Sequence, residues 1–235
     1  SLAVNSSSHI FAGTDNGAYR STDGGKNWVE IDKGLMGTIV LTMAVTKERI
    51  IFAGTDGSGV YRSTDSGGSW SQVNVGFVNL IVHSIVVSSN GALLAATGNR
   101  VFRSTDKGGS WNEASTGLPF GTVMSLAVNA SGYVYAGTWG RGVYFSADNG
   151  DSWSEVNTGL PSGAICVSLA IDSSQTVFVG TIEPGQVYRS TNNGENWSAA
   201  SSGLPNSNVA SLAVSPSGAM FAAMSSAGVY RSTDK

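Results

Sequence analysis

The sequence has few of the residues from which metal and cofactor sites are built. Its 235 residues include one cysteine and two histidines. One cysteine cannot form an internal disulfide. His83 has only the distant His9 as a companion, which is too little for a clustered ligand set. We therefore predict no metal site and no cofactor.

Charge is also scarce, at 12% of the residues, and the net charge is -3. A surface for nucleic acid or anionic membranes needs clustered Lys and Arg. No apolar run approaches the roughly 18 residues needed to span a bilayer. We predict no nucleic-acid partner and no membrane insertion. The segment Ser1–Val4 already matches the internal repeat and no secretory leader precedes it, so we expect a mature or trimmed product.

The single cysteine, Cys166, lies in the apolar segment 164–167. This setting favours a buried small hydrophobe. The alternative is a reactive thiol, which would need a polar and partly exposed environment.

Glycine, at 31 residues, and a repeated motif are what the sequence has in plenty. The motif reads Ser-x-Asp-x-Gly-x-x-Trp and follows an apolar-aromatic pair. Its tryptophans lie 42, 41, 42 and 44 residues apart, and a sixth copy begins at Tyr230 and is cut off at Lys235. The motif residues are Ser21, Asp23, Gly25, Trp28, Ser63, Asp65, Gly67, Trp70, Ser104, Asp106, Gly108, Trp111, Ser146, Asp148, Gly150, Trp153, Ser190, Asn192, Gly194 and Trp197.

Each motif position has a structural interpretation as part of a strand, a tight turn and a second strand. The Asp accepts hydrogen bonds from backbone N–H groups of the turn, and Asn192 keeps that acceptor. The Gly supplies a positive φ. The Trp covers the hairpin with a large apolar ring, and we expect Trp28 and Trp111 to be buried.

These residues resemble the Asp-box, or BNR repeat, of bacterial sialidases, sortilin-type receptors, xyloglucanases and photosystem assembly-factor propellers. The resemblance implies a β-propeller fold. In those families the box is a folding element that lies away from the active site. It also implies an extracellular or cell-surface bacterial protein.

A period near 42 residues predicts an all-β fold, a β-propeller with one four-stranded blade per repeat. We expect a single domain over residues 1–235, with repeats at about 1–41, 42–83, 84–124, 125–167, 168–210 and 211–235. Innermost strands are predicted at 1–4, 42–45, 84–87, 125–128, 168–171 and 211–214, and second strands at 10–14, 51–55, 93–97, 134–138, 177–181 and 220–224.

The repeats contain six copies of the first three strands and five of the fourth. This count predicts six blades, of which the last lacks its outermost strand, in a monomer closed by packing of the first blade against the sixth. Two alternatives stay open: the chain is a fragment, or a partner chain supplies a strand to the exposed edge.

Departures from the repeat mark the candidate ligand site. The loops between second and third strands share one face with the inter-blade connections, which contribute Met36, Asn79, His83, Phe120 and Asn206. Trp139 and Arg141 depart most, because an aromatic face beside a guanidinium suits a sugar ring or a carboxylate. The alternative is that Trp139 only plugs the funnel of the propeller. The candidate ligand-binding residues are Trp139, Arg141, Glu183, Arg100, Asp56 and Asp15.

Three functions remain open at this stage. A non-catalytic module that binds a glycan or protein on the loop face is favoured, because propellers host many unrelated functions. A glycoside hydrolase is the alternative, either sialidase-like or with two carboxylates drawn from Asp15, Asp56 and Glu183. The sequence has no Arg-Ile-Pro motif of sialidases, and we assign no catalytic residue. Near-identical repeats also fit a recently amplified or engineered propeller with no evolved ligand.

Overall fold

The computed structural model describes residues 1–35 and 37–234, which form 23 strands in six antiparallel sheets. Met36 and Lys235, assigned above to the first inter-blade connection and the sixth motif, lie outside the described residues. The protein is a six-bladed β-propeller whose last sheet has three strands, as the repeat count predicts. No described residue belongs to a helix that is long and apolar enough to cross a membrane.

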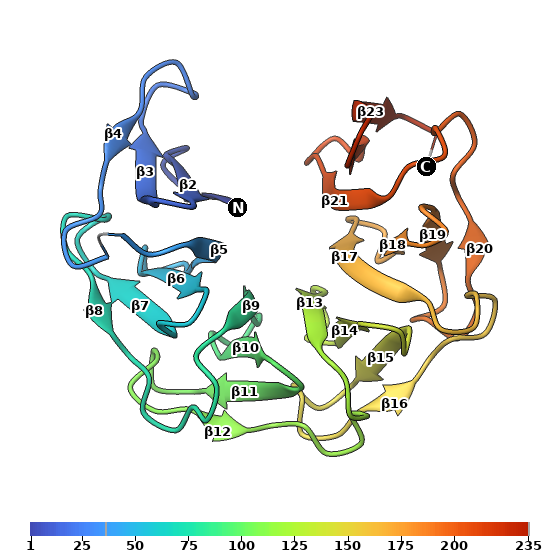
Figure 1. Ribbon diagram of the computed structural model, residues 1–235, viewed down its shortest axis with the longest axis horizontal. Helices are drawn as coiled ribbons and strands as arrows, with labels where there is room; N and C mark the ends of the chain where they lie inside the picture. Colours follow the sequence, from blue (N-terminus) through green and yellow to red (C-terminus); the bar gives the residue numbers. More distant parts are fainter. Residues whose placement is uncertain (36, 235) are drawn as a thin grey trace. The chain divides into compact units, whose positions relative to one another are not determined.

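Strands follow chain order within every sheet (Figure 1). The first strands are β1 (Leu2–Val4), β5 (Val40–Val45), β9 (Val82–Val87), β13 (Val123–Val128), β17 (Ile165–Ile171) and β21 (Val209–Val214). The second strands are β2 (Ile10–Thr14), β6 (Ile51–Thr55), β10 (Leu93–Thr97), β14 (Val134–Thr138), β18 (Val177–Ile182) and β22 (Met220–Met224).

The third strands carry the apolar-aromatic pair that precedes each motif, and the fourth strands follow the motif tryptophan. The third strands are β3 (Gly17–Ser21), β7 (Val60–Ser63), β11 (Arg100–Ser104), β15 (Val143–Ser146), β19 (Val187–Ser190) and β23 (Gly228–Ser232). The fourth strands are β4 (Val29–Glu30), β8 (Ser71–Gln72), β12 (Asn112–Glu113), β16 (Ser154–Glu155) and β20 (Ser198–Ala199).

The second strands match their predicted ranges, with one extra residue in β18. The first strands from β5 onward begin two or three residues earlier than predicted. The reason is a β-bulge: in the fourth sheet Val123 pairs with Thr138 and Ser125 with Gly137, so the register shifts between them. A bulge leaves one residue unpaired and breaks the sequence alternation that reveals a strand.

The chain divides into two compact units, Ser1–Ala114 and Ser115–Lys235. The first unit holds three four-stranded sheets; the second holds two four-stranded sheets and the three-stranded sheet. Within each unit the first strands of successive sheets contact one another. The core consists of apolar clusters between successive sheets, such as the one around Phe52, Val82 and Phe102.

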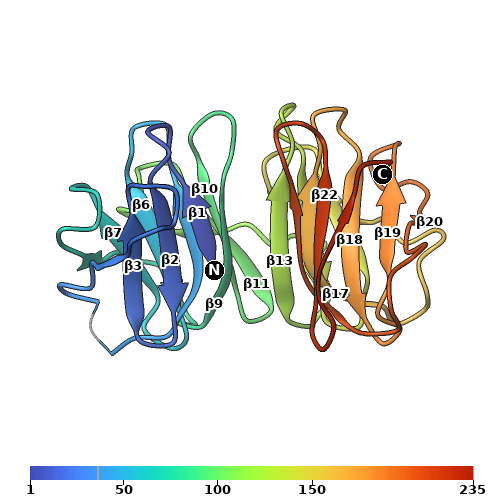
Figure 2. The same cartoon turned by 90° about the horizontal axis from the view of Figure 1, so that it is seen from above.

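The connections of each sheet lie at its two ends (Figure 2). Because the strands are antiparallel and sequential, the loop between second and third strands is at one end, and the motif turn between third and fourth strands is at the other. We call these the loop end and the motif end. Candidate ligand residues and motif residues are therefore separated within each sheet, as predicted.

Candidate binding surface at the loop end

The motif residues are engaged with one another at the motif end. In the third copy the Ser104 hydroxyl donates to Asp106 at 2.7 Å, and the Ser110 backbone N–H donates to Asp106 at 2.9 Å. The Gly108 N–H donates to the Ser104 hydroxyl at 2.9 Å, and Gly108 has a φ of 83°. In the fifth copy Asn192 accepts the Asn196 N–H at 3.0 Å, so the amide replaces the carboxylate as predicted.

These hydrogen bonds stabilise the ionised carboxylate. The backbone N–H of Ser110, followed by the hydroxyls of Ser104 and Ser110, lowers the pKa of Asp106 to about 2. The Ser69 hydroxyl and its neighbours do the same for Asp65, whose pKa is also about 2. A carboxylate held in this way is stabilised as a turn acceptor and is a poor proton donor.

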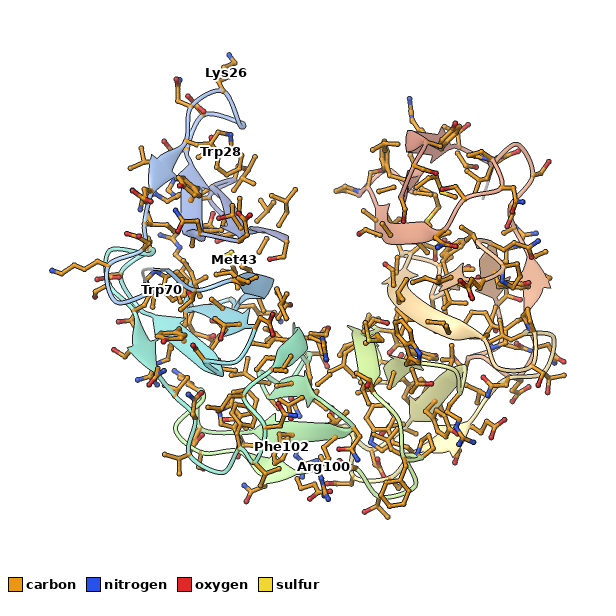
Figure 3. All side chains as sticks on the ribbon, in the orientation of Figure 1. Lys26, Trp28, Met43, Trp70, Arg100 and Phe102 are labelled. Atoms are coloured by element: carbon orange, nitrogen blue, oxygen red, sulfur yellow. The ribbon has the colours of Figure 1, made fainter. Side chains whose placement is uncertain are left out.

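The tryptophans do more than cover their own hairpins. Trp70 and Trp111 are buried and donate their indole N–H to the preceding sheet, at Ile31 O (2.6 Å) and Val73 O (2.8 Å). Trp28 lies in the first sheet (Figure 3) and is 42% exposed, so the expectation that it is buried is wrong. Its indole N–H donates to Gly25 O of its own turn at 3.1 Å.

At the loop end, residues 139–142 join β14 to β15, and several elements form hydrogen bonds with their backbone. The Trp139 N–H donates to Thr122 O at 2.8 Å, and the Gly142 N–H donates to Ala164 O at 3.0 Å. The Asn157 amide donates to Arg141 O at 3.0 Å. These hydrogen bonds fix the loop backbone and do not involve the side chains of Trp139 and Arg141.

The side chains of this loop are exposed. Trp139 is 52% exposed, and Arg141 is also exposed. Phe120, in the preceding inter-sheet connection, is 88% exposed. Its neighbour Gly121 lies against this loop, because a Cβ added there would be 3.7 Å from both Arg141 Cγ and Trp139 O. We call Phe120, Trp139 and Arg141 the aromatic-arginine cluster.

The second sheet has the same loop backbone and different side chains. The Asp56 N–H donates to Ile39 O at 3.0 Å, and the Gly59 N–H donates to Leu80 O at 2.8 Å. The Val60 N–H donates to Asn74 Oδ1 at 2.7 Å, as the Val143 N–H does to Asn157 Oδ1. Asp56 thus occupies the position that Trp139 has in the fourth sheet. The two loops keep the same backbone hydrogen bonds and differ in their side chains.

The other candidate residues lie apart from one another in sequence: Arg100 begins β11, and Asp15 and Glu183 lie in loops of other sheets. Arg100 forms an ion pair with Glu113 of β12, so its guanidinium is engaged within its own sheet (Figure 3). Asp15 is exposed in the β2–β3 turn. Glu183 lies in the β18–β19 loop and precedes a cis proline, Pro184. No hydrogen bond or ion pair joins any two of the predicted ligand-binding residues in the described part of the chain.

Asp56 lies near a histidine. Burial lowers the pKa of the half-buried His83, and the Asp56 carboxylate opposes this shift. The pair is not part of a larger cluster: the described residues contain no group of three or more His, Cys, Asp or Glu that could hold a metal ion.

An apolar strip in the first unit was missed by the sequence reasoning. Four exposed aliphatic side chains come from two inter-sheet connections at the loop end; they are Ile39, Val78, Leu80 and Ile81. Besides the bonds to Ile39 O and Leu80 O given above, two more backbone contacts hold this strip to the Asp56 loop: Asp56 bridges Ile81, and Gly57 N–H donates to Leu80 O at 3.2 Å. The mostly apolar run of residues 75–82 could have indicated this strip, but we interpreted it only as an inter-blade connection.

The family follows from comparison with known sequences. The sequence profile of the DUF6242 β-propeller domain matches residues 1–132 and again 119–235. The chain belongs to this family. No curated protein matches the DUF6242 chain in sequence.

Solved structures show what this DUF6242 propeller is similar to in fold. An ancestral GH74 enzyme superposes with a TM-score of 0.81 at 21% identity, over 97% of this chain and 35% of that one. The GH74 xyloglucanase from Xanthomonas campestris gives 0.79 at 19%, over 98% and 43%. Ycf48 bound to D1 peptide gives 0.73 at 16%, over 99% and 81%. The chain thus spans 35% to 43% of the two GH74 enzymes.

Proposed function

We propose that this DUF6242 propeller is a non-catalytic binding module whose ligand surface is the aromatic-arginine cluster at the loop end. The observation that carries the proposal is the exposure of Trp139 and Arg141 on a hydrogen-bonded loop backbone, with the exposed Phe120 in the adjoining connection. Exposed apolar patches rimmed by polar groups mark interaction sites. A fixed backbone lowers the entropy lost when a ligand binds.

A glycan is the ligand class that fits this cluster best. The flat face of Trp139 can pack against the C–H face of a sugar ring. Arg141 forms no ion pair within the described residues, and its planar guanidinium matches a carboxylate with two parallel hydrogen bonds. We therefore propose a sugar that carries a carboxylate.

Binding is preferred to hydrolysis because no two of the candidate carboxylates share a loop. A two-carboxylate glycosidase needs its acid and base about 5–9.5 Å apart. Asp15 and Asp56 belong to loops of different sheets in the first unit, and Glu183 belongs to the second unit. The fold is shared with two GH74 enzymes, but the chain spans under half of each.

We propose that the repeated motif is an Asp-box with a purely structural role. The motif carboxylates Asp106 and Asp65 accept hydrogen bonds from groups of their own turns. Within the fourth sheet the motif turn lies at the end opposite Trp139 and Arg141, which leaves the loop end to vary.

A protein partner is the second candidate, and the apolar strip favours it. Ile39, Val78, Leu80 and Ile81 offer aliphatic side chains without the paired polar groups that a sugar needs. Aliphatic and aromatic groups dominate the centres of protein interfaces.

The test is a glycan array that includes uronic and sialic acids, probed with the wild-type chain and with Trp139→Ala and Arg141→Ala. We expect each variant to weaken binding to acidic glycans at least about ten-fold, because buried aromatic and Arg contacts dominate binding energies. The thermal midpoint should not change, since both side chains are exposed.

The matched control is the double variant Trp139→Asp/Arg141→Ser, which copies the side chains that the second sheet carries on the same backbone. It should fold and fail to bind. Binding that survives in all three variants would contradict the proposed surface. Absence of glycan binding at high protein concentration would reject the glycan and favour the protein partner.

A further inference from the structure

Phe120 is the most exposed large apolar side chain of residues 1–35 and 37–234, at 88%. It lies in the connection from β12 to β13 (Figure 1). Single exposed apolar residues are common on protein surfaces, so exposure alone does not mark a site. The position of Phe120 in the repeat and the structure of its connection carry the argument further.

Phe120 departs from the repeat at a position where the other connections have small or polar residues. Each connection contains a glycine, and the variable residue follows it three positions later. The glycines are Gly34, Gly76, Gly117, Gly159 and Gly203, and the variable residues are Gly37, Asn79, Phe120, Ser162 and Asn206. The loops between second and third strands contain one aromatic residue in the whole sequence, Trp139.

These two aromatic departures lie on segments that contact each other. The Trp139 N–H donates to Thr122 O of the Phe120 connection at 2.8 Å. Gly121, which follows Phe120, lies against Arg141, since a Cβ added there would be 3.7 Å from Arg141 Cγ. Two unusual rings on adjoining segments, beside the same arginine, favour one shared ligand over two unrelated surface residues.

The connection that carries Phe120 is held along its length. The Leu118 N–H donates to Ser115 O at 2.9 Å, and the Trp153 N–H donates to Thr116 O at 2.8 Å. Pro119, which is half-buried, fixes its own φ directly before Phe120. The backbone under the exposed ring is therefore ordered before any ligand arrives, which lowers the entropy cost of binding.

We propose that the ligand is an acidic oligosaccharide of at least two sugar residues, and that Phe120 packs against the sugar next to the one held by Trp139 and Arg141. This inference rests on the proposed glycan surface and adds the length of the glycan. A single sugar that lies on Trp139 and pairs its carboxylate with Arg141 leaves the ring of Phe120 in water. A second sugar offers that ring a C–H face.

The test is calorimetric titration of the intact chain with galacturonic acid and with mannuronic acid, each as monomer, dimer and trimer. We expect the dimer to bind about ten-fold more tightly than the monomer, because it gains the contact with Phe120. Equal affinities of monomer and dimer would overturn the inference and leave the proposed function in place. No binding of any length at millimolar concentration would reject the acidic glycan itself, and the inference with it.

Phe120→Ser is the matched variant, because it gives the connection the sequence Gly-Leu-Pro-Ser-Gly that the chain already has at 159–163. The thermal midpoint should not change, since the ring is exposed. Dimer affinity should fall about ten-fold, to that of the monomer, and monomer affinity should stay the same. Arg141→Ala should weaken both. Equal weakening of monomer and dimer by Phe120→Ser, or no weakening of either, would refute the role of Phe120.

The double variant Phe120→Ser/Ser162→Phe controls for the presence of an exposed ring. It keeps the composition and moves the ring to the exposed equivalent position of the next connection. We expect it to bind the dimer no better than Phe120→Ser does. Recovery of the wild-type affinity would mean that the place of the ring does not matter, which would overturn the assignment of the second sugar to Phe120.

Discussion

The motif tryptophans share a sequence context and differ in environment. Trp111 is 2% exposed, stacks on Phe77 at a centroid distance of 4.8 Å and donates its N–H to the second sheet. Trp28 occupies the same motif position, and its indole N–H donates to Gly25 O of its own turn. What a repeat residue contributes to stability therefore depends on the presence of a preceding sheet.

Replacing these two tryptophans by alanine should have unequal effects. Trp111→Ala removes a buried ring and leaves Val73 O without its indole donor, so we expect a loss of about 3–5 kcal/mol in the free energy of unfolding. Trp28→Ala should cost about 1–2 kcal/mol, because much of this ring is already in water. Urea unfolding of both variants measures the difference. Equal losses would contradict the packing of Trp111 on the preceding sheet.

At the scale of the element, the motif turn is a hairpin organised around one acceptor side chain. The hydroxyls and N–H groups that converge on Asp65 and Asp106 replace the backbone partners that a tight turn lacks. Asn192 performs the same task without a charge. The turn needs an oxygen acceptor, and an ionised Asp carboxylate accepts these hydrogen bonds more strongly than a neutral amide does.

This arrangement predicts acid sensitivity. The pKa of Asp106 is about 2 in the folded chain, against about 3.9 when unfolded. Between these values the unfolded chain binds more protons, so the stabilisation present above pH 4 is lost as the pH falls toward 2. Asp106→Asn should remove this share of the pH dependence, as Asn192 does naturally. Urea unfolding of wild type and variant at pH 7 and pH 2.5 measures it. A wild-type stability that rises on acidification over this range would contradict the assignment.

At the scale of the whole molecule, stability comes from sheets packed on one another within each unit. The single cysteine lies in the fifth sheet, and its accessibility measures whether that sheet is closed. Cys166 in β17 is completely buried, and burial raises the pKa of its thiol to about 12. This agrees with the buried hydrophobe expected from its apolar segment. A neutral, enclosed thiol is a poor nucleophile.

Labelling of Cys166 by a thiol reagent at pH 8 should therefore wait for opening of the fifth sheet. We expect the labelling rate to follow urea concentration together with the unfolding transition. The control is Cys166→Ser/Ser173→Cys, which moves the thiol to an exposed turn and should react at once. Rapid labelling of the native wild type would contradict the burial.

The sequence by itself determined the all-β class, the number of blades, the second strands and the motif turns. Each of these depends on contacts within about 42 residues, which repeat and so are visible several times. Only the tertiary structure decided how far each first strand extends, because a bulge hides its start. It alone showed that Trp28 is exposed, that Glu113 engages Arg100, and that Gly121 lies against the loop that carries Trp139 and Arg141. These facts depend on what a neighbouring strand or connection places beside a residue, and a local pattern does not contain that information.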